Sequence, residues 1–303
     1  RRAGARAGQA QPLAIAGLAA FLAGVAGIFD AGMAALADLR PGAAFLAAGG
    51  VLEAVTRVMT GSLDAAFALV RPPGHHAEHD RQMGFCIFNN IAVAAQYARR
   101  RFGLERILIV DWDVHHPNGT QHIFEKNPEV LLFSTHRFPF FPGTGDLGDI
   151  GLEAGRGFTV NVPLPAQQDD SDFAFTYRNL LAPLAREFNP QLVLVSAGFD
   201  THYDDPIGGM RLTEHGYCYL ADTLLGIADA ACQGKIVFVL EGGYDLGALR
   251  KSVKAVLETM LDGMPQEAKS KIERNMRDTS AVPDIIAAVK DVQEPYWKSM
   301  SDV

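Results

Sequence analysis

Six short runs of consecutive apolar residues recur along the chain and constrain its fold more than any other feature. They are AAFALV (65–70), RILIV (106–110), VLLFS (130–134), FTVNV (158–162), LVLVS (192–196) and KIVFVL (235–240). Continuous rather than alternating hydrophobicity indicates strands covered on both faces, as in parallel sheets. Helix-like spacing fills three of the intervening segments, 89–101, 169–188 and 212–232. The alternation predicts an α/β fold with a mainly parallel sheet and helices on both faces.

Chain length and composition favour one domain. The 303 residues, 48% of them hydrophobic, suffice for one large core, and no repeat, linker or charge block divides the chain after Gly50. We assign residues 43–303 to this domain and residues 1–42 to an Ala/Gly-rich N-terminal segment. The uncharged run 13–29 falls short of the roughly 20 apolar residues of a membrane span. We therefore favour an amphipathic helix there over a span or a signal segment.

Charge and cysteine content argue against nucleic-acid binding, a disulfide framework and a thiolate metal site. The formal net charge is −8, and the one basic cluster is Arg99–Arg101, which disfavours direct binding of nucleic acid. Cys86, Cys218 and Cys232 are too few and too scattered for a disulfide framework, and no C-x-x-C pair suggests a thiolate metal site. We expect a reducing, cytoplasmic location. Any metal must be held by imidazole and carboxylate.

Polar clusters follow the first two runs, where strands are expected to end. RPPGHHAEHD begins at Arg71 and DWDVHHPNGTQ begins at Asp111. In open α/β sheets, ligands bind at this carboxyl edge. Extended backbone would place Asp111, Asp113 and His115 on one face, so an Asp and a His two residues apart reach one metal. Asp200, which follows another run, offers a third ligand, and this donor set neutralises Zn²⁺ and leaves a position for water.

A neutralised zinc acidifies its water less than an all-histidine site does, so a separate general base is needed. The tandem His75–His76, on a turn rich in proline and glycine, can supply it. In EGGYD, after the last run, Tyr244 sits on a glycine turn and can donate to a developing oxyanion. The Gly/Pro-rich segment 138–157 is too long for a tight connection, which indicates a functional loop.

These motifs resemble those of the zinc-dependent histone deacetylase family. The resemblance is closest to the class II type and extends to bacterial histone deacetylase-like amidohydrolases and acetylpolyamine amidohydrolases. It runs from about Ala43 to about Leu261 and rests on RPPGHHAE, MGFCIFNN, DWDVHH-NGTQ, FFPGTGD, NVPLP, SAGFD…DDPIGG and LEGGYD, in family order. So many ordered motifs leave little room for chance. The resemblance implies an arginase/deacetylase-like catalytic domain over 43–303, with the active site at the carboxyl ends of the strands.

Catalytic roles follow from the resemblance by position. His76 would be the general base that later protonates the leaving amine, and His75 its electrostatic partner, oriented by Asp111. Asn118 stands where class I members have a carboxylate and class II members an asparagine, so His76 should be less basic than a carboxylate-paired histidine. Tyr244 would bind the carbonyl oxygen and the tetrahedral oxyanion.

The resemblance also implies two kinds of metal site. The expected zinc ligands are Asp113, His115 and Asp200. The expected ligands of an inner potassium ion are the carbonyls of Asp111, Asp113, His115 and Thr135 and the hydroxyl of Ser134. The expected ligands of an outer potassium ion are the carbonyls of Phe124, Asn127, Val130 and Phe158.

The implied reaction is removal of an acetyl or short acyl group from a lysine side chain. Phe85 and Phe141 would sandwich the methylene stem, with the Gly84 carbonyl nearby. Two alternatives stay open: an acetylpolyamine deacetylase, disfavoured because Ile207 stands where polyamine-selective relatives have an acidic residue, and a catalytically impaired acyl-lysine binding module. The second alternative arises from Pro117, which replaces a family glycine and lacks its N–H and its freedom in φ. The expected partner is an acyl-lysine peptide or a small acylated amine, and the oligomeric state is open.

Several residues carry plainer interpretations. Without the resemblance, Tyr244, Phe85 and Phe141 would be assigned to ordinary packing. Structural or surface roles are expected for five further histidines: His79, His122, His136, His202 and His215. Asp204 and Asp205 raise the question of a second metal, as in arginase-like relatives, but the D-W-D-V-H-H pattern favours a single zinc.

Overall fold

Six parallel strands form one sheet, and each contains most of one apolar run. The computed structural model describes residues 41–276 and 282–301, so the run at 13–29 lies outside the described residues. The strands are β1 (Ala65–Ala68), β2 (Ile107–Asp111), β3 (Val130–Arg137), β4 (Thr159–Leu164), β5 (Leu192–Ala197) and β6 (Ile236–Leu240). Their order is β1-β6-β5-β2-β3-β4, and every pairing is parallel. The predicted α/β fold is confirmed.

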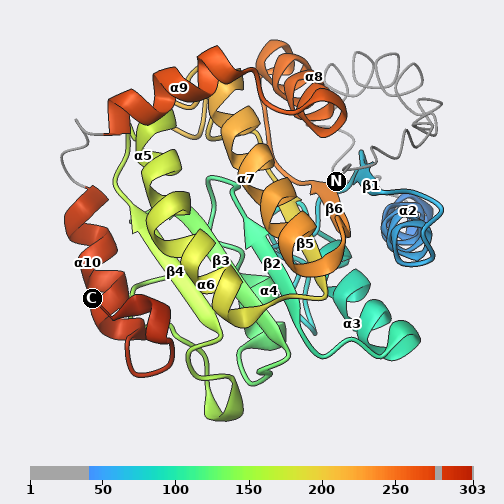
Figure 1. The fold of residues 1–303 in the computed structure, drawn as a ribbon. Helices are drawn as coiled ribbons and strands as arrows, with labels where there is room; N and C mark the ends of the chain where they lie inside the picture. Colours follow the sequence, from blue (N-terminus) through green and yellow to red (C-terminus); the bar gives the residue numbers. More distant parts are fainter. Residues whose placement is uncertain (1–40, 277–281, 302–303) are drawn as a thin grey trace, which may run out of the picture.

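Helices cover both faces of this sheet (Figure 1). One face carries α2 (Pro41–Met59) and α3 (Asn90–Phe102). The larger core, on the opposite face, is built with α5 (Asp170–Thr176), α6 (Ala182–Phe188), α7 (Glu214–Cys232), α8 (Leu246–Asp262) and α10 (Val282–Gln293). The remaining α-helices of the described residues are α4 (Asn118–Phe124), which follows β2, and α9 (Gln266–Asn275), which packs on α5 and α7. Two short 3-10 helices, Glu153–Gly155 and Lys298–Met300, lie before β4 and after α10, respectively.

Strand β2 shows why its apolar run is continuous. Ile107 and Ile109 join the core with α2 and α3, whereas Leu108 and Val110 join the core on the other face. All four side chains are fully buried. Alternate residues of a strand point to opposite faces, so a strand covered on both sides needs an apolar residue at every position.

The segment 169–188 differs from the single helix that its spacing predicts. Asp169 caps α5 by accepting the N–H groups of Ser171 and Asp172, and Asp172 completes a capping box. A π-helical turn, Tyr177–Leu181, then separates α5 from α6. The apolar period is close to helical throughout, which is why the interruption cannot be seen in the sequence.

One helix among the described residues, α2, is long and apolar enough to cross a membrane by length and composition alone, with a mean hydropathy of 1.3 over Gly42–Met59. Its residues Val51, Val55 and Val58 are buried in the core shared with α3 and β1. Packing in this core explains why the inner face of α2 is apolar. The expectation of no membrane span stays a prediction.

The buried centre of the sheet supplies a test of this packing. Leu194 of β5 is fully buried, so Leu194→Ala should lower the free energy of unfolding by about 2–5 kcal/mol through lost burial and a residual cavity. Leu261→Ala is the matched control, because that side chain is 60% exposed, and its change should stay within about 0.5 kcal/mol. Urea denaturation measures both, and equal effects would contradict the assigned core.

Candidate active site

Four neighbouring strands bring the predicted site together at their carboxyl ends. β1, β6, β5 and β2 are adjacent in the sheet. The segments that follow them contain His75–His76, Glu241–Tyr244, Asp200 and Asp113–His116, respectively, and Asp111 is the last residue of β2. Parallel strands end at the same edge, so segments distant in sequence meet there. The site therefore lies where the sequence predicts it.

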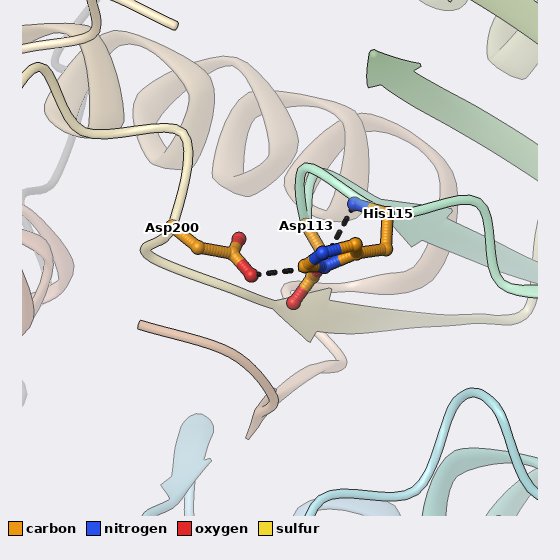
Figure 2. Close-up of side chains that lie close together, drawn as sticks. All are labelled: Asp113, His115 and Asp200. Carbon is orange, nitrogen blue, oxygen red and sulfur yellow. Dashed lines mark hydrogen bonds and ion pairs between the residues drawn. The ribbon is translucent and has the colours of Figure 1, made fainter. Parts of the chain in front are cut away.

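Asp113, His115 and Asp200 form a buried cluster (Figure 2). One ligand atom from each residue lies within 4.8 Å of the other two. The Nδ1 atom of His115 lies 2.9 Å from Asp113 Oδ1 and 3.2 Å from Asp200 Oδ2. A single imidazole nitrogen thus faces two carboxylates, as expected when the three groups surround one cation.

The backbone after β2 reaches this arrangement by turning and not by continuing as a strand. Asp111 Oδ1 accepts the N–H of Asp113 at 3.0 Å, and Asp113 Oδ1 accepts the N–H of His115 at 2.9 Å. Such bonds two residues ahead are typical of Asx turns. The extended backbone predicted for 111–115 is therefore wrong beyond Asp111, but the side chains still face the site. Asp111 Oδ2 lies 3.1 Å from His75 Nδ1, and Asp113 Oδ1 lies 3.8 Å from His75 Nε2 and 2.9 Å from His115 Nδ1.

The donor atoms of the cluster fit a zinc ion. Asp200 Oδ1 accepts the N–H of Val114, whereas its buried Oδ2 has His115 Nδ1, at 3.2 Å, as its one polar contact among the described residues. A side chain at Gly198 or Gly242 would collide with the carboxylates, so glycine is required at both positions for the close approach of the backbone. Two buried carboxylates need a compensating charge. A carboxylate–imidazole set with an open position is chemically suited to catalytic zinc.

The pKa values of the cluster residues also indicate that a positive charge must balance the two carboxylates. Burial and the charge of Asp113 raise the pKa of Asp200 to about 7. Although burial favours neutral His115, its hydrogen bonds to Asp113 and Asp200 raise its pKa to about 10. Burial alone would raise the pKa of Asp113, but the charge on His75 and the contacts with His115 hold it well below its usual range. Without a metal, a proton on His115 balances the carboxylates.

The tandem histidines face different partners. Although burial opposes protonation, the charges of Asp113 and Asp111 raise the pKa of His75 to about 10. Burial and the neighbouring charge of His75 lower the pKa of His76 to about 2. The two rings lie 4.0 Å apart, so one proton on the pair resides on His75. His76 Nδ1 lies 2.7 Å from Asn118 Oδ1.

Glu241 is a site residue that the sequence reasoning missed. Its fully buried carboxylate accepts the N–H groups of Gly74 at 2.6 Å and His75 at 3.2 Å, and its other oxygen accepts the Ser196 hydroxyl at 3.3 Å. Burial raises its pKa to about 7. The only available signal was its place in LEGGYD, because its partners lie far away in sequence.

The backbone of Tyr244 is held by Asp205, whose role as a backbone acceptor the sequence did not indicate. Asp205 Oδ2 accepts the N–H of Tyr244 at 2.8 Å, and its Oδ1 accepts the N–H groups of Ile207 and Gly208 at 2.9 and 3.1 Å. Asp205 thus serves as a backbone acceptor, and the described residues offer one metal cluster, to which it does not belong. Burial raises the pKa of Tyr244 above its usual range, so its hydroxyl keeps its proton at neutral pH.

Pro117 fits its position without strain. Its φ of −80° is compatible with the proline ring, and it directly precedes α4, where a missing N–H removes no helical hydrogen bond. His115 remains in the cluster and Asn118 remains against His76. Pro117 is thus compatible with the metal cluster and with the contact between Asn118 and His76.

The predicted substrate residues lie around this site. Phe141 packs edge-on against His76 at 5.1 Å and His115 at 5.9 Å between ring centroids, and Phe85 lies 6.5 Å from the Tyr244 ring. Both phenylalanines remain about half exposed, as does Ile207. Gly84 has a φ of +54°, and a side chain there would collide with His76. Their roles in binding stay predictions.

The predicted potassium residues fall into two groups. Ser134 pairs with Asp111 in the β2–β3 register, and the Thr135 hydroxyl lies 3.5 Å from the Asp111 carbonyl. In the outer group, Phe124, Asn127 and Phe158 each use a carbonyl to accept a backbone N–H, from Asn127, Val130 and Leu132, respectively. Ser134 Oγ also bonds His136 Nδ1 at 2.9 Å. Potassium binding at either group stays a prediction.

The fold and this cluster define an α/β protein with a candidate metal centre at the carboxyl edge of a parallel sheet. The model of the histone deacetylase domain family matches residues 33–260, beginning about ten residues before the predicted start. The chain belongs to the histone deacetylase family, a family of zinc-dependent hydrolases. The domain boundary predicted at residue 42 stays a prediction.

Curated relatives and a solved structure agree with this assignment. The chain is 45% identical over 273 residues to histone deacetylase 5 of Arabidopsis thaliana, covering 86% of this chain and 40% of that protein. It is 43% identical over 262 residues to the polyamine deacetylase HDAC10 of Mus musculus, covering 84% and 38%. The crystal structure of the HDA15 HD domain matches with a TM-score of 0.77 and 40% identity, covering 85% of this chain and 70% of that one. The chain thus spans about two fifths of the length of these curated relatives.

Protonation of the metal ligands predicts a pH-dependent metal affinity. Because the pKa values of His115 and Asp200 are raised to about 10 and about 7, metal-free protein holds protons there that metal binding must displace. The apparent Kd for Zn²⁺ should weaken by at least about tenfold per pH unit on going from about pH 8 to about pH 6. Competition with a chromophoric chelator measures it. Asp204→Asn, a change at an exposed residue outside the cluster, should show the same slope; a pH-independent Kd would contradict the ligand assignment.

Proposed function

We propose that this chain is a zinc-dependent amidohydrolase that removes acetyl or short acyl groups from lysine side chains. The observation that carries the proposal is the meeting of the metal cluster with the tandem histidines, since His75 Nε2 lies 3.8 Å from Asp113 Oδ1. A metal-binding group, a neutral imidazole and a protonated one therefore border the same space. Together these groups can activate a water, accept its proton and stabilise the negative charge that develops during amide hydrolysis.

The metal ligands and the two histidines would have separate roles in catalysis. Zinc, when bound by Asp113, His115 and Asp200, would polarise the substrate carbonyl and acidify a water. Neutral His76 would take a proton from that water, because its low pKa leaves it unprotonated at neutral pH. His75, kept protonated by Asp111, would stabilise the negative charge that develops.

Tyr244 would donate its hydroxyl proton in a hydrogen bond to the carbonyl oxygen as that oxygen becomes negative. The backbone hydrogen bond to Asp205 holds this residue at the site. His76, once protonated, would transfer its proton to the departing amine, and the low pKa that makes it a weak base makes it an effective acid at this step.

The walls of the site support this choice of substrate class. Half-exposed Phe85 and Phe141 offer apolar faces suited to a methylene chain, with the Gly84 carbonyl beside them. A relative described as a polyamine deacetylase keeps the acetylpolyamine alternative in view. Apolar Ile207 supports an acyl-lysine substrate over an acetylpolyamine, since its side chain offers no charge to a second substrate cation. The same proposal includes a structural role for K⁺ at the two predicted groups, Asp111–Ser134 and Phe124–Phe158. It also includes a cytoplasmic location, which is supported by the three buried free cysteines.

Turnover by the zinc-loaded protein tests the function. The substrates are an acetyl-lysine peptide, the corresponding trifluoroacetyl-lysine peptide and acetylated spermidine. The acetyl-lysine peptide should be hydrolysed with a higher kcat/KM than acetylspermidine. A preference for acetylspermidine would contradict the argument that apolar Ile207 disfavours a polyamine substrate. Peptide binding without turnover would favour the catalytically impaired acyl-lysine binding module.

Tyr244→Phe separates catalysis from binding. Loss of an oxyanion donor should lower kcat for the acetyl-lysine peptide by about 10²–10³-fold. Peptide affinity, measured by calorimetry, should change little, because the ring is retained. Tyr203→Phe is the matched control, since Tyr203 is an exposed tyrosine outside the assigned site, and it should keep wild-type turnover. Unchanged turnover in Tyr244→Phe would refute the role of Tyr244.

A further inference from the structure

A buried carboxylate lies directly behind Asn118. Asn118 Nδ2 donates to Glu78 Oε1 at 2.6 Å, while Asn118 Oδ1 faces His76 Nδ1 at 2.7 Å. The Glu78 side chain is only 4% exposed although its neighbours His79 and Asp80 are exposed. The three side chains therefore form a continuous line from His76 through Asn118 to Glu78.

Glu78 is itself held in place by a third residue. His122 Nδ1 lies 2.8 Å from Glu78 Oε2 and 3.0 Å from Oε1. Asn118 and His122 are four residues apart on α4, so they project from the same face of the helix toward one carboxylate. Arg81, 3.6 Å from Oε1, is mostly exposed and adds a weaker contact.

The chemistry of these groups fixes the direction of every hydrogen bond in the line. A carboxylate only accepts, so Glu78 must face the NH₂ group of the Asn118 amide. The amide oxygen then faces His76 and can only accept, which requires the proton of neutral His76 to be on Nδ1. The other nitrogen, Nε2, is left with its lone pair free. An asparagine alone can present either end of its amide to the imidazole, but an asparagine backed by a carboxylate cannot.

We propose that Glu78 is a positioning residue that orients the Asn118 amide and thereby holds His76 in the tautomer with a basic Nε2. This inference rests on the proposed function, because it assigns Glu78 a part in the action of the same general base. A hydrogen bond to a charged group is also stronger than one between neutral groups. The Glu78 charge therefore polarises the amide toward His76, supplying through Asn118 part of what a carboxylate at position 118 would supply directly.

The test compares the effect of Glu78→Gln on kcat in two backgrounds, one with Asn118 and one with Asn118→Asp. Glu78→Gln retains the shape but offers both a donor and an acceptor to Asn118, so it should lower kcat on the acetyl-lysine peptide by about tenfold or more, with a small change in KM. In an Asn118→Asp background, position 118 accepts without needing orientation, and Glu78 instead faces a like charge. There, Glu78→Gln should leave kcat unchanged or raise it.

Asp80→Asn is the matched control, because it removes an exposed carboxylate from the same loop and should leave kcat unchanged in both backgrounds. Metal content and thermal midpoint report whether each variant folds. A Glu78→Gln loss of the same size in both backgrounds, or no loss in either, would overturn the proposal.

A second measurement does not depend on turnover. In protein labelled with ¹⁵N-histidine and loaded with Zn²⁺, the side-chain nitrogen shifts of His76, assigned by comparison with His76→Gln, should show protonated Nδ1 and unprotonated Nε2. Glu78→Gln should shift them toward a mixture of tautomers, and Asp80→Asn should not. Inactive wild-type protein with this tautomer pattern would reject the proposed function but not the positioning role, whereas unchanged shifts in Glu78→Gln would reject the positioning role.

Discussion

Two fully buried carboxylates, Asp113 and Asp200, face the same imidazole nitrogen at the edge where four parallel strands end. Among the described residues, the ion-pair partners of these carboxylates are His75 and His115, so a bound cation or a protonated imidazole must balance their charge. The surrounding backbone is arranged around this constraint. Gly198 and Gly242 allow close approach to the carboxylates, and the Gly242 N–H donates to Asp113 Oδ2 at 2.8 Å.

The buried negative charge at this edge of the sheet also gives the tandem histidines different protonation states. His75 faces Asp111 and the cluster and is protonated, whereas His76 faces a neutral amide and stays neutral. Two chemically identical side chains, adjacent in sequence, thereby have pKa values shifted in opposite directions by their surroundings. Glu241 accepts the N–H groups of Gly74 and His75, which fixes the turn on which this division depends.

The sequence predicted most of the fold and the members of the site, but not their connections. Continuous apolar runs revealed the six strands of the described residues, because burial on both faces leaves a direct signature, and ordered motifs named His76 and the three residues of the candidate metal cluster. Asp205, Glu241 and Glu78 were missed as partners because their contacts lie up to 167 residues away and no local pattern encodes them. The turns after Asp111 were mistaken for strand because i to i+2 side-chain bonds leave the spacing unchanged.

The central claim, that one metal at this cluster supports hydrolysis, is tested most directly by titrating Zn²⁺ into chelator-treated protein while measuring acetyl-lysine hydrolysis and bound metal. We predict that verified metal-free protein is inactive and that activity rises in proportion to bound zinc, reaching its maximum at one ion per chain. Asp200→Asn should lower both the zinc affinity and the restored activity. Activity in protein shown to be metal-free, or zinc bound at wild-type affinity by Asp200→Asn, would contradict the account.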